Sequence, residues 1–212
     1  MKSSFVCLNC GNTTSKWFGR CPECNEWNTL EQQDIAVQPE KAQKNSRRKS
    51  FGSTETTRAQ HIGEITYSGN LRLKTGISEF DRVLGGGLVE GSVVLLSGEP
   101  GIGKSTLLLQ ICQSIDNTES VLYITGEESL SQIKLRAGRV GVDSENLLLL
   151  SETNINKIVR EINGVKPSVV IVDSIQTIYD DEIASSPGSV TQVKQSAMHL
   201  INVAKESGIS VI

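Results

Sequence analysis

Short, continuous apolar runs alternate along most of the chain with stretches in which apolar residues recur every three or four positions. The runs Ser92–Gly98, Ser120–Gly126, Asn146–Glu152 and Pro167–Ser174 predict strands, and their unbroken apolar character is typical of parallel strands buried on both faces. The stretches Lys104–Ile115, Ser129–Arg139, Asn154–Gly164 and about Ser189–Glu206 predict helices, the last opening with a capping box of Ser189 and Gln192. This alternation predicts an α/β domain in which helices flank a parallel sheet.

The first 64 residues lack this alternation and divide into two parts. Residues 1–30 contain four of the five cysteines and predict a small separate module. Residues 31–64 are polar and show neither a helical nor a strand period, which predicts a flexible linker. The linker's basic residues either contact phosphates or are simply solvated; they are Lys41, Lys44, Arg47, Arg48 and Lys49. The main domain then covers residues 65–212.

Composition and charge narrow the class of protein. Of 212 residues, 37% are hydrophobic and 21% are charged, as in soluble globular proteins. The net charge of -3 provides no overall attraction to nucleic acid, so nucleic-acid binding needs a local patch. No apolar run approaches the roughly 20 residues of a membrane helix, and the first ten residues lack the apolar segment of a signal peptide. We therefore expect a cytoplasmic protein without a membrane partner.

The four early cysteines form two Cys-x-x-Cys pairs separated by ten residues: Cys7, Cys10, Cys21 and Cys24. In a reducing compartment this spacing favours a metal site, and four sulfurs suit a structural Zn²⁺ ion. A redox dithiol or two disulfides are the alternatives. Since four protein ligands close the site, catalysis at the metal is not expected. The nearby rings of Trp17, Phe18 and Trp27 are expected to cover the site, either as the module's own core or as a contact for DNA or a partner.

The first predicted strand of the main domain leads directly into "GEPGIGKST", which fits the phosphate-loop pattern G-x-x-x-x-G-K-[ST] between a strand and a helix. Its glycines let backbone N–H groups turn toward phosphates, and the following helix directs its positive end at them. Lys104 is predicted to reach the β- and γ-phosphates of ATP, Ser105 to bind Mg²⁺ and Thr106 to contact the α-phosphate. The predicted nucleotide-binding residues are Gly98, Glu99, Pro100, Gly101, Ile102, Gly103, Lys104, Ser105 and Thr106.

Three acidic residues follow other predicted strands. Asp173 ends the run "VVIVD", the position from which a carboxylate holds the Mg²⁺ shell in phosphate-loop enzymes. Glu127 and Glu128 end the run "LYITG", where a carboxylate is able to orient the attacking water. We predict that Glu127 has this role and that Glu128 caps the next helix.

Several other residues carry no predicted chemistry. Cys112 lies in an apolar helix and is expected in the core. His61 and His199 have no partner motif and are interpreted as structural or surface residues. Gly85–Gly87 resemble a phosphate loop but precede the strand, so we expect them to form the turn into it.

The cysteine module together with "TGISEFDRVLGGGLVEGSVVLLSGEPGIGKSTLLLQI", "LYITGEES" and "VVIVDSIQTIY" resembles the bacterial RadA (Sms) family of DNA repair proteins. The resemblance implies a RecA-like P-loop NTPase core behind a zinc-ribbon-like module, with Glu127 as the catalytic glutamate. It also implies a homo-hexamer that drives branch migration on single-stranded and branched DNA, with recombinases or replicative helicases as partners. Residues 180–190 match the first DNA-binding loop of RecA-like proteins, and within it we expect contacts from Ser185, Ser186, Gly188, Ser189 and Lys194.

The family pattern continues past residue 212, into a Lys-Asn-Arg-Phe-Gly motif and a Lon-protease-like domain. We therefore expect a C-terminally incomplete domain and weak ATPase activity from these residues alone. Two other functions share the ATPase motifs: a KaiC-like signalling ATPase, and a non-catalytic, nucleotide-gated scaffold for DNA or a partner. The cysteine module argues against the first of these.

Overall fold

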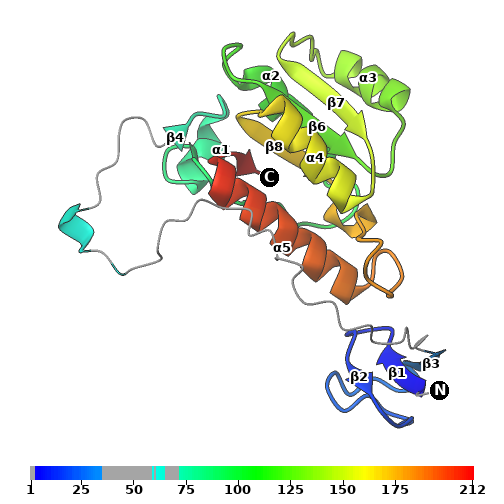
Figure 1. Ribbon diagram of the computed structural model, residues 1–212. Helices are drawn as coiled ribbons and strands as arrows, with labels where there is room; N and C mark the ends of the chain where they lie inside the picture. The colour runs from blue at the N-terminus through cyan, green and yellow to red at the C-terminus, as the bar shows by residue number, and fades with distance from the viewer. Residues whose placement is uncertain (1–2, 35–58, 60, 65–71) are drawn as a thin grey trace. The chain divides into compact units, whose positions relative to one another are not determined.

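The computed structural model describes residues 3–34, 59, 61–64 and 72–212. The chain separates into two compact units, residues 1–69 and 70–212, which are taken in turn below (Figure 1). The predicted basic cluster at 41–49 lies outside the described residues.

The first unit is built around a small antiparallel sheet. Its strands β1 (Ser3–Cys7), β2 (Thr13–Thr14) and β3 (Leu30–Asp34) pair in the order β2-β1-β3. β3 runs beside the whole of β1, with Cys7 opposite Leu30 and Ser3 opposite Asp34. The polar residues 31–34 were predicted to belong to the linker, but they form this edge strand instead, because their backbone groups pair with those of β1. A short 3-10 helix, Ile62–Glu64, also lies within the predicted linker.

The second unit is an α/β domain, as predicted. Its four-stranded sheet is parallel throughout and has the order β7-β6-β8-β9. The strands are β6 (Val121–Thr125), β7 (Leu147–Ser151), β8 (Val169–Asp173) and β9 (Ser210–Val211). The helices are α1 (Ser78–Val83), α2 (Lys104–Ser114), α3 (Leu130–Arg139), α4 (Ile155–Val165) and α5 (Val190–Ser207), with a 3-10 turn at Ile175–Thr177.

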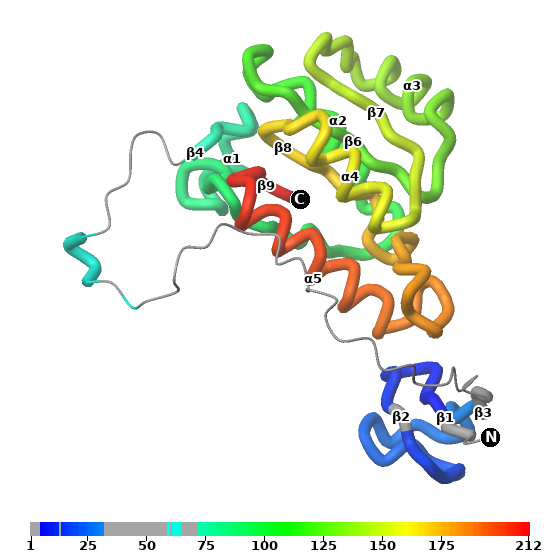
Figure 2. The backbone as a smooth tube through the Cα atoms, in the orientation of Figure 1, coloured from blue at the N-terminus to red at the C-terminus, as the bar shows by residue number. Residues whose placement is uncertain are grey.

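Alternate residues of the central strands enter two separate cores. Val121 and Tyr123 of β6 pack with α2 and α3, and the core on that face includes the predicted core residue Cys112. Leu122 and Ile124 pack with α4 and α5 on the other face. The domain therefore has three layers, with the sheet between two layers of helices (Figures 1 and 2). This burial on both faces explains the continuous apolar runs in the sequence.

The predicted strand at Ser92–Gly98 forms only in part. Val93 bridges Val211 in parallel, the Val94 N–H donates to the Val211 carbonyl at 2.8 Å, and the Val211 N–H donates to the Ser92 carbonyl at 2.9 Å. The chain segment at β9 therefore lies between the β8 strand and the segment that leads to the phosphate loop. Beyond Val94 the segment has no regular strand pairing within the described residues, and Leu95 is 80% exposed.

Gly85–Gly87 form the predicted turn rather than a phosphate loop. The turn connects α1 to β5 (Leu88–Val89), which pairs antiparallel with β4 (Arg72–Leu73). Gly87 has φ +130°, and a Cβ there would lie 2.5 Å from the Leu73 carbonyl oxygen. Close approach of two backbones is therefore the reason for glycine at this position.

The helix α5 begins at Val190 with Ser189 as its N-cap, but the cap differs from the predicted one. The Ser189 hydroxyl accepts a hydrogen bond from the Gln192 N–H at 3.3 Å. The Gln192 side chain does not return to Ser189, so the predicted capping box is wrong; that side chain binds the preceding loop instead. Within the described residues, no helix is both long and apolar enough to cross a membrane.

Gly126 provides a test of how tightly the carboxyl edge of the sheet is packed. A Cβ at Gly126 would lie 2.0 Å from Thr177 Oγ1 and 3.0 Å from Thr153 Cγ2. We predict that Gly126→Ala lowers the free energy of unfolding by about 1–3 kcal/mol, because this overpacking displaces the 3-10 turn. Urea unfolding followed by far-UV circular dichroism measures the change.

Gly138→Ala is the matched control, because a Cβ at Gly138 in α3 would meet nothing within 4 Å. It should leave stability unchanged or raise it by up to about 1 kcal/mol. Equal destabilisation by the two substitutions would contradict the packing argument.

Candidate functional site

The four cysteines of the first unit converge on one point. Their Sγ atoms all lie within 4.8 Å of one another, and all four thiols are free. Cys7 and Cys24 are 3.6 Å apart, as are Cys10 and Cys21, so each contact joins one Cys-x-x-Cys pair to the other. A disulfide requires about 2.05 Å between sulfurs, whereas four thiolates placed about 2.3 Å from a central zinc ion are roughly 3.8 Å apart. The separation fits a tetrahedral metal ion and excludes the disulfide alternative.

The electrostatics of the cluster agree with a cation. Backbone hydrogen bonds from Cys24 and Glu23 lower the pKa of the Cys21 thiol, whereas burial and the neighbouring sulfurs raise the pKa of Cys10 to about 12. Four thiolates at this spacing repel one another, so all four ionise only when a positive ion sits among them. The donor set therefore fits Zn²⁺, and a zinc ion with four protein ligands contributes to folding, not to catalysis.

The three rings that were expected to cover the cysteines do not pack with them. Trp17, Phe18 and Trp27 are 57%, 47% and 67% exposed, so the prediction that they cover the site is wrong. The apolar residues that pack with the cysteines are Leu30 and Phe5, from β3 and β1. The strand pairing between β1 and β3 brings these two residues to the metal site, which the spacing of residues in the sequence did not indicate.

The phosphate loop connects the end of the Ser92–Gly98 segment to α2. Gly101 and Gly103 have φ +80° and +103°, and a Cβ at either would meet no atom within 4 Å, which leaves space above the loop. Lys104 Nζ donates to the carbonyl oxygens of Gly98 and Glu99 at 2.7 and 2.9 Å. The predicted lysine therefore lies folded over its own loop, beside the first turn of α2 that holds Ser105 and Thr106. This arrangement fits a phosphate cradle at a helix N-terminus.

Asp173 lies at the same edge of the sheet as the phosphate loop, because Asp173 ends β8 and the loop follows the Ser92–Gly98 segment, which runs parallel to β9 and hence to β8. Its Oδ2 accepts a hydrogen bond of 2.6 Å from the hydroxyl of Tyr123. Tyr123 is fully buried in β6, and burial together with the Asp173 carboxylate raises the pKa of its phenol. The hydroxyl fixes one carboxylate oxygen and leaves the other for a ligand. Sequence reasoning missed Tyr123, which looked like one more residue of an apolar strand.

The structure distinguishes the two adjacent glutamates after β6. Glu128 forms an ion pair with Arg136 of α3, and its N–H donates to Thr125 Oγ1 at 3.1 Å. The α3 cap is Ser129, which forms a capping box with Gln132, so the prediction that Glu128 caps this helix is wrong. Glu127 is exposed, and its carboxylate accepts a hydrogen bond of 2.9 Å from Ser174, the residue after Asp173. Glu127 is thus the glutamate that faces Asp173's end of β8.

The segment 180–189 is held to α5 by one buried amide. Gln192 is 1% exposed; its Oε1 accepts from the Asp180 N–H at 2.8 Å, and its Nε2 faces the carbonyls of Asp180, Ile183 and Ser185 at 2.9–3.2 Å. Of the acidic residues that open the segment, Asp180 is turned inward, since it is 5% exposed and lies 3.3 Å from His199 Nε2, whereas Asp181 and Glu182 are exposed. His199 was interpreted as a structural or surface residue, and it contacts this aspartate.

The predicted contact residues of this segment lie close together. The Ser189 and Ser185 hydroxyls are 3.1 Å apart, and Gly188 has φ +81°. Ser186 and Lys194 are exposed, the latter on the first turns of α5. These residues therefore share one end of the helix.

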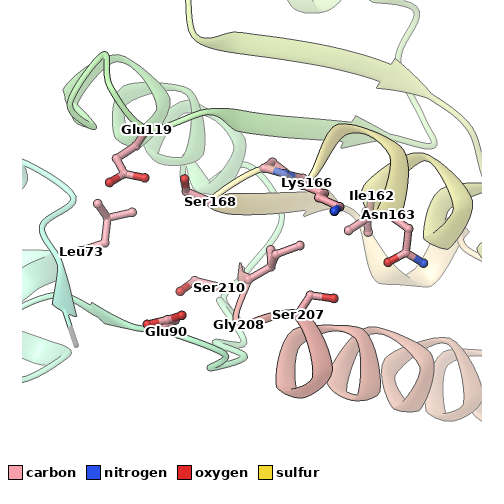
Figure 3. Close-up of a pocket in the computed structure, with 12 residues that line it drawn as sticks. Leu73, Glu90, Glu119, Ile162, Asn163, Lys166, Ser168, Ser207, Gly208 and Ser210 are labelled. Carbon is pink, nitrogen blue, oxygen red and sulfur yellow. The ribbon is translucent and has the colours of Figure 1, made fainter. Parts of the chain in front are cut away.

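A cavity of about 510 Å³ lies at the opposite edge of the sheet, where β8 and β9 begin (Figure 3). Glu90, Glu119 and Lys166 contribute charges of both signs, and serines from the ends of α5 and the starts of the strands complete the lining. None of the predicted site residues lines it. The predicted chemistry therefore lies at the carboxyl edge, where open parallel sheets bind ligands.

The metal site gives a direct prediction. Cys10→Ser should release the ion and unfold the first unit, because metal binding contributes on the order of 10 kcal/mol to folding of so small a module. Zinc content per chain should fall to about zero, and the fluorescence of Trp17 and Trp27 should shift. Cys112→Ala is the control, since Cys112 is buried in the second unit and should leave one zinc per chain. A Cys10→Ser protein that kept a full equivalent of zinc would contradict the four-cysteine assignment.

Comparison with known families agrees with the division of the chain into a metal-binding unit and an α/β domain. The family model for the ATPase KaiC matches residues 73–152, and a model described as the rubredoxin metal binding domain matches residues 5–32. Together these confirm the predicted fold class, a RecA-like ATPase core behind a metal-binding module.

Whole-chain relatives share both parts. The DNA repair protein RadA of Bacillus subtilis is 47% identical over 99% of this chain, that of Escherichia coli K12 42% over 100%, and that of Aquifex aeolicus 41% over 98%. The chain spans 45–46% of the length of these relatives. The similarity to RadA proteins therefore extends over both the cysteine module and the ATPase core of this chain.

Proposed function

We propose that this chain is the metal-binding and ATPase part of a DNA repair enzyme that uses ATP to process branched recombination intermediates. The observation that carries the proposal is the meeting of the phosphate loop, Asp173 and Glu127 at one edge of a parallel sheet, in a chain that also has a four-cysteine module. In this proposal Lys104 binds the β- and γ-phosphates of ATP, Ser105 and Asp173 hold Mg²⁺, and Glu127 orients the water for in-line attack.

The DNA-contacting part of the proposal concerns the segment 185–194. Because Asp180 is buried against His199 and Gln192, its carboxylate is kept away from the exposed end of the segment. The N–H groups of Val190 and Thr191 in the first turn of α5 and the exposed Lys194 then provide donors for phosphates. We propose that these groups contact single-stranded DNA, with the whole protein acting as a homo-hexamer beside recombinases or replicative helicases.

We further infer that these 212 residues bind ATP better than they hydrolyse it. Ring ATPases complete their sites with a cation from the neighbouring subunit, which contributes about 10³–10⁵ in rate where it is used. Turnover by this chain is therefore expected to be slow compared with that of a whole-length relative measured in parallel.

One other function is favoured by a specific observation. The KaiC model match covers the phosphate loop and Glu127, so a signalling ATPase with no use for DNA would have the same catalytic edge. The two functions differ in whether single-stranded DNA accelerates hydrolysis. Strong stimulation in a whole-length protein carrying this sequence supports the repair enzyme, and hydrolysis indifferent to DNA contradicts it.

The catalytic roles predict a separation of binding from hydrolysis. Lys104→Ala should abolish ATP binding, because the γ-phosphate loses its main counter-charge. Glu127→Gln should bind ATP normally but hydrolyse it at least 100-fold more slowly, because the water loses its base. Fluorescent-nucleotide titration and single-turnover phosphate release measure the two properties. Glu128→Gln is the matched control and should keep hydrolysis, since Glu128 is paired with Arg136; loss of hydrolysis in this control alone would transfer the role to Glu128.

The DNA contact predicts a difference between two lysines of one helix. Lys194 and Lys205 are both exposed on α5, about 16 Å apart along its axis. Lys194→Glu should weaken binding to a fluorescent single strand several-fold and reduce the salt dependence of binding by about one ion. Lys205→Glu, which makes the same change in net charge at the far end, should have little effect. Anisotropy titrations in which both variants bind like the parent would contradict the contact.

A further inference from the structure

The Ser174 hydroxyl links the two strands that carry the proposed catalytic carboxylates. Ser174 follows Asp173 at the end of β8, and its Oγ lies 2.9 Å from Glu127 Oε1, in the loop after β6. Among the described residues, no other side chain forms a hydrogen bond to the Glu127 carboxylate. An exposed glutamate without such a bond samples several rotamers, and only some of them direct its carboxylate at one point.

Proton counting gives the direction of this contact. A hydroxyl has one proton, yet Ser174 Oγ lies near two acceptors, Glu127 Oε1 at 2.9 Å and Gln176 Oε1 at 3.3 Å. The carboxylate is the stronger acceptor, so the proton goes to Glu127. The Gln176 amide then satisfies the contact by presenting its NH₂ group to Ser174, since amide oxygen and nitrogen exchange places by a rotation. The result is a chain of hydrogen bonds from Gln176 through Ser174 to Glu127.

The backbone beneath Ser174 is fixed on both sides. The hydroxyl and the N–H of Thr177 both donate to the Ser174 carbonyl, at 2.8 and 3.1 Å, and close the 3-10 turn. Thr177 in turn fills the space where a Cβ on Gly126 would lie, and Gly126 is the residue before Glu127. The Gly126 N–H also donates to the Asp173 carbonyl at 3.2 Å. Ser174 is therefore held at a set position relative to the backbone of Glu127.

We propose that Ser174 is a positioning residue that aims the Glu127 carboxylate at the attacking water, with Gln176 supporting the serine from behind. Ser174 itself contacts neither nucleotide nor metal in this proposal. The hydrogen bond from Ser174 restricts the exposed Glu127 side chain to fewer rotamers, so that its carboxylate stays within hydrogen-bond distance of the attacking water. The inference rests on the proposed role of Glu127 in hydrolysis.

The test compares variants of the whole protein that lack or keep the Ser174 hydroxyl. Ser174→Ala should lower the single-turnover rate of ATP hydrolysis roughly 10- to 100-fold, with the ATP dissociation constant unchanged within about twofold. Ser174→Thr keeps the hydroxyl and should recover most of the rate. If Ser174 had only a structural role, Ser174→Ala would lower ATP affinity and thermal stability as well as the rate of hydrolysis. The threonine and alanine variants would then have similar rates.

A second background shows whether Ser174 acts through Glu127. Glu127→Asp keeps a carboxylate but shortens it by one methylene, so the bond to Ser174 is lost while slow hydrolysis remains measurable. In that background Ser174→Ala should have little further effect. Equal loss from Ser174→Ala in both backgrounds, or a parental rate for Ser174→Ala beside an impaired Glu127→Gln, would overturn the inference. A parental rate for Glu127→Gln would instead overturn the proposed function from which the inference starts.

Discussion

The parallel pairing of β6 with β8 is the constraint on which the candidate site depends. Its register places Thr125 opposite Asp173, so the residues that follow each strand meet at one edge. A slip of β8 by one residue would move Val169 and Ile171 from the α2 and α3 side to the α4 and α5 side, and Val170 in the opposite direction. Since both faces are filled by separate buried clusters, such a slip would disrupt two cores at once. The carboxylates at the edge are therefore positioned by core packing.

The metal-binding unit is stabilised in a different way. Its described core consists of Cys7, Cys21 and Leu30, with Phe5, Cys10 and Cys24 packed against them. So small an apolar set does not offset the entropy of ordering about 30 residues, and a metal ion supplies what the core lacks. The exposed rings of Trp17, Phe18 and Trp27 are therefore not part of the core that stabilises this unit.

Polar side chains organise both loops at the carboxyl edge. Ser174 and Thr177 fix the turn after β8, while Gln192 binds four backbone groups of the following segment. Gln192 is buried, and a buried amide is stable only when its hydrogen bonds are made. The turn and the segment after it are thereby held in defined conformations by hydrogen bonds.

The sequence by itself determined the features that depend on neighbouring residues. The Cys-x-x-Cys spacing, the phosphate loop between strand and helix, and the apolar strands Val121–Thr125 and Val169–Asp173 all follow from local pattern, because metal, phosphate and sheet burial each require particular residues at short intervals.

Only the tertiary structure decided features that join distant segments. The pairing of β3 with β1 places Leu30 beside the cysteines. The pairing of β6 with β8 lets the Tyr123 hydroxyl donate to Asp173. Glu127 accepts a hydrogen bond from Ser174, which is 47 residues away in the sequence. Gln192 does not form the expected capping box because its side-chain oxygen accepts from the Asp180 N–H and its NH₂ group donates to carbonyls of the loop, while the Ser189 N–H donates to the Ser186 carbonyl. The physical reason is common to all of them: a hydrogen bond or contact between residues far apart in the chain is set by strand register and burial, and a single sequence carries neither in its local pattern.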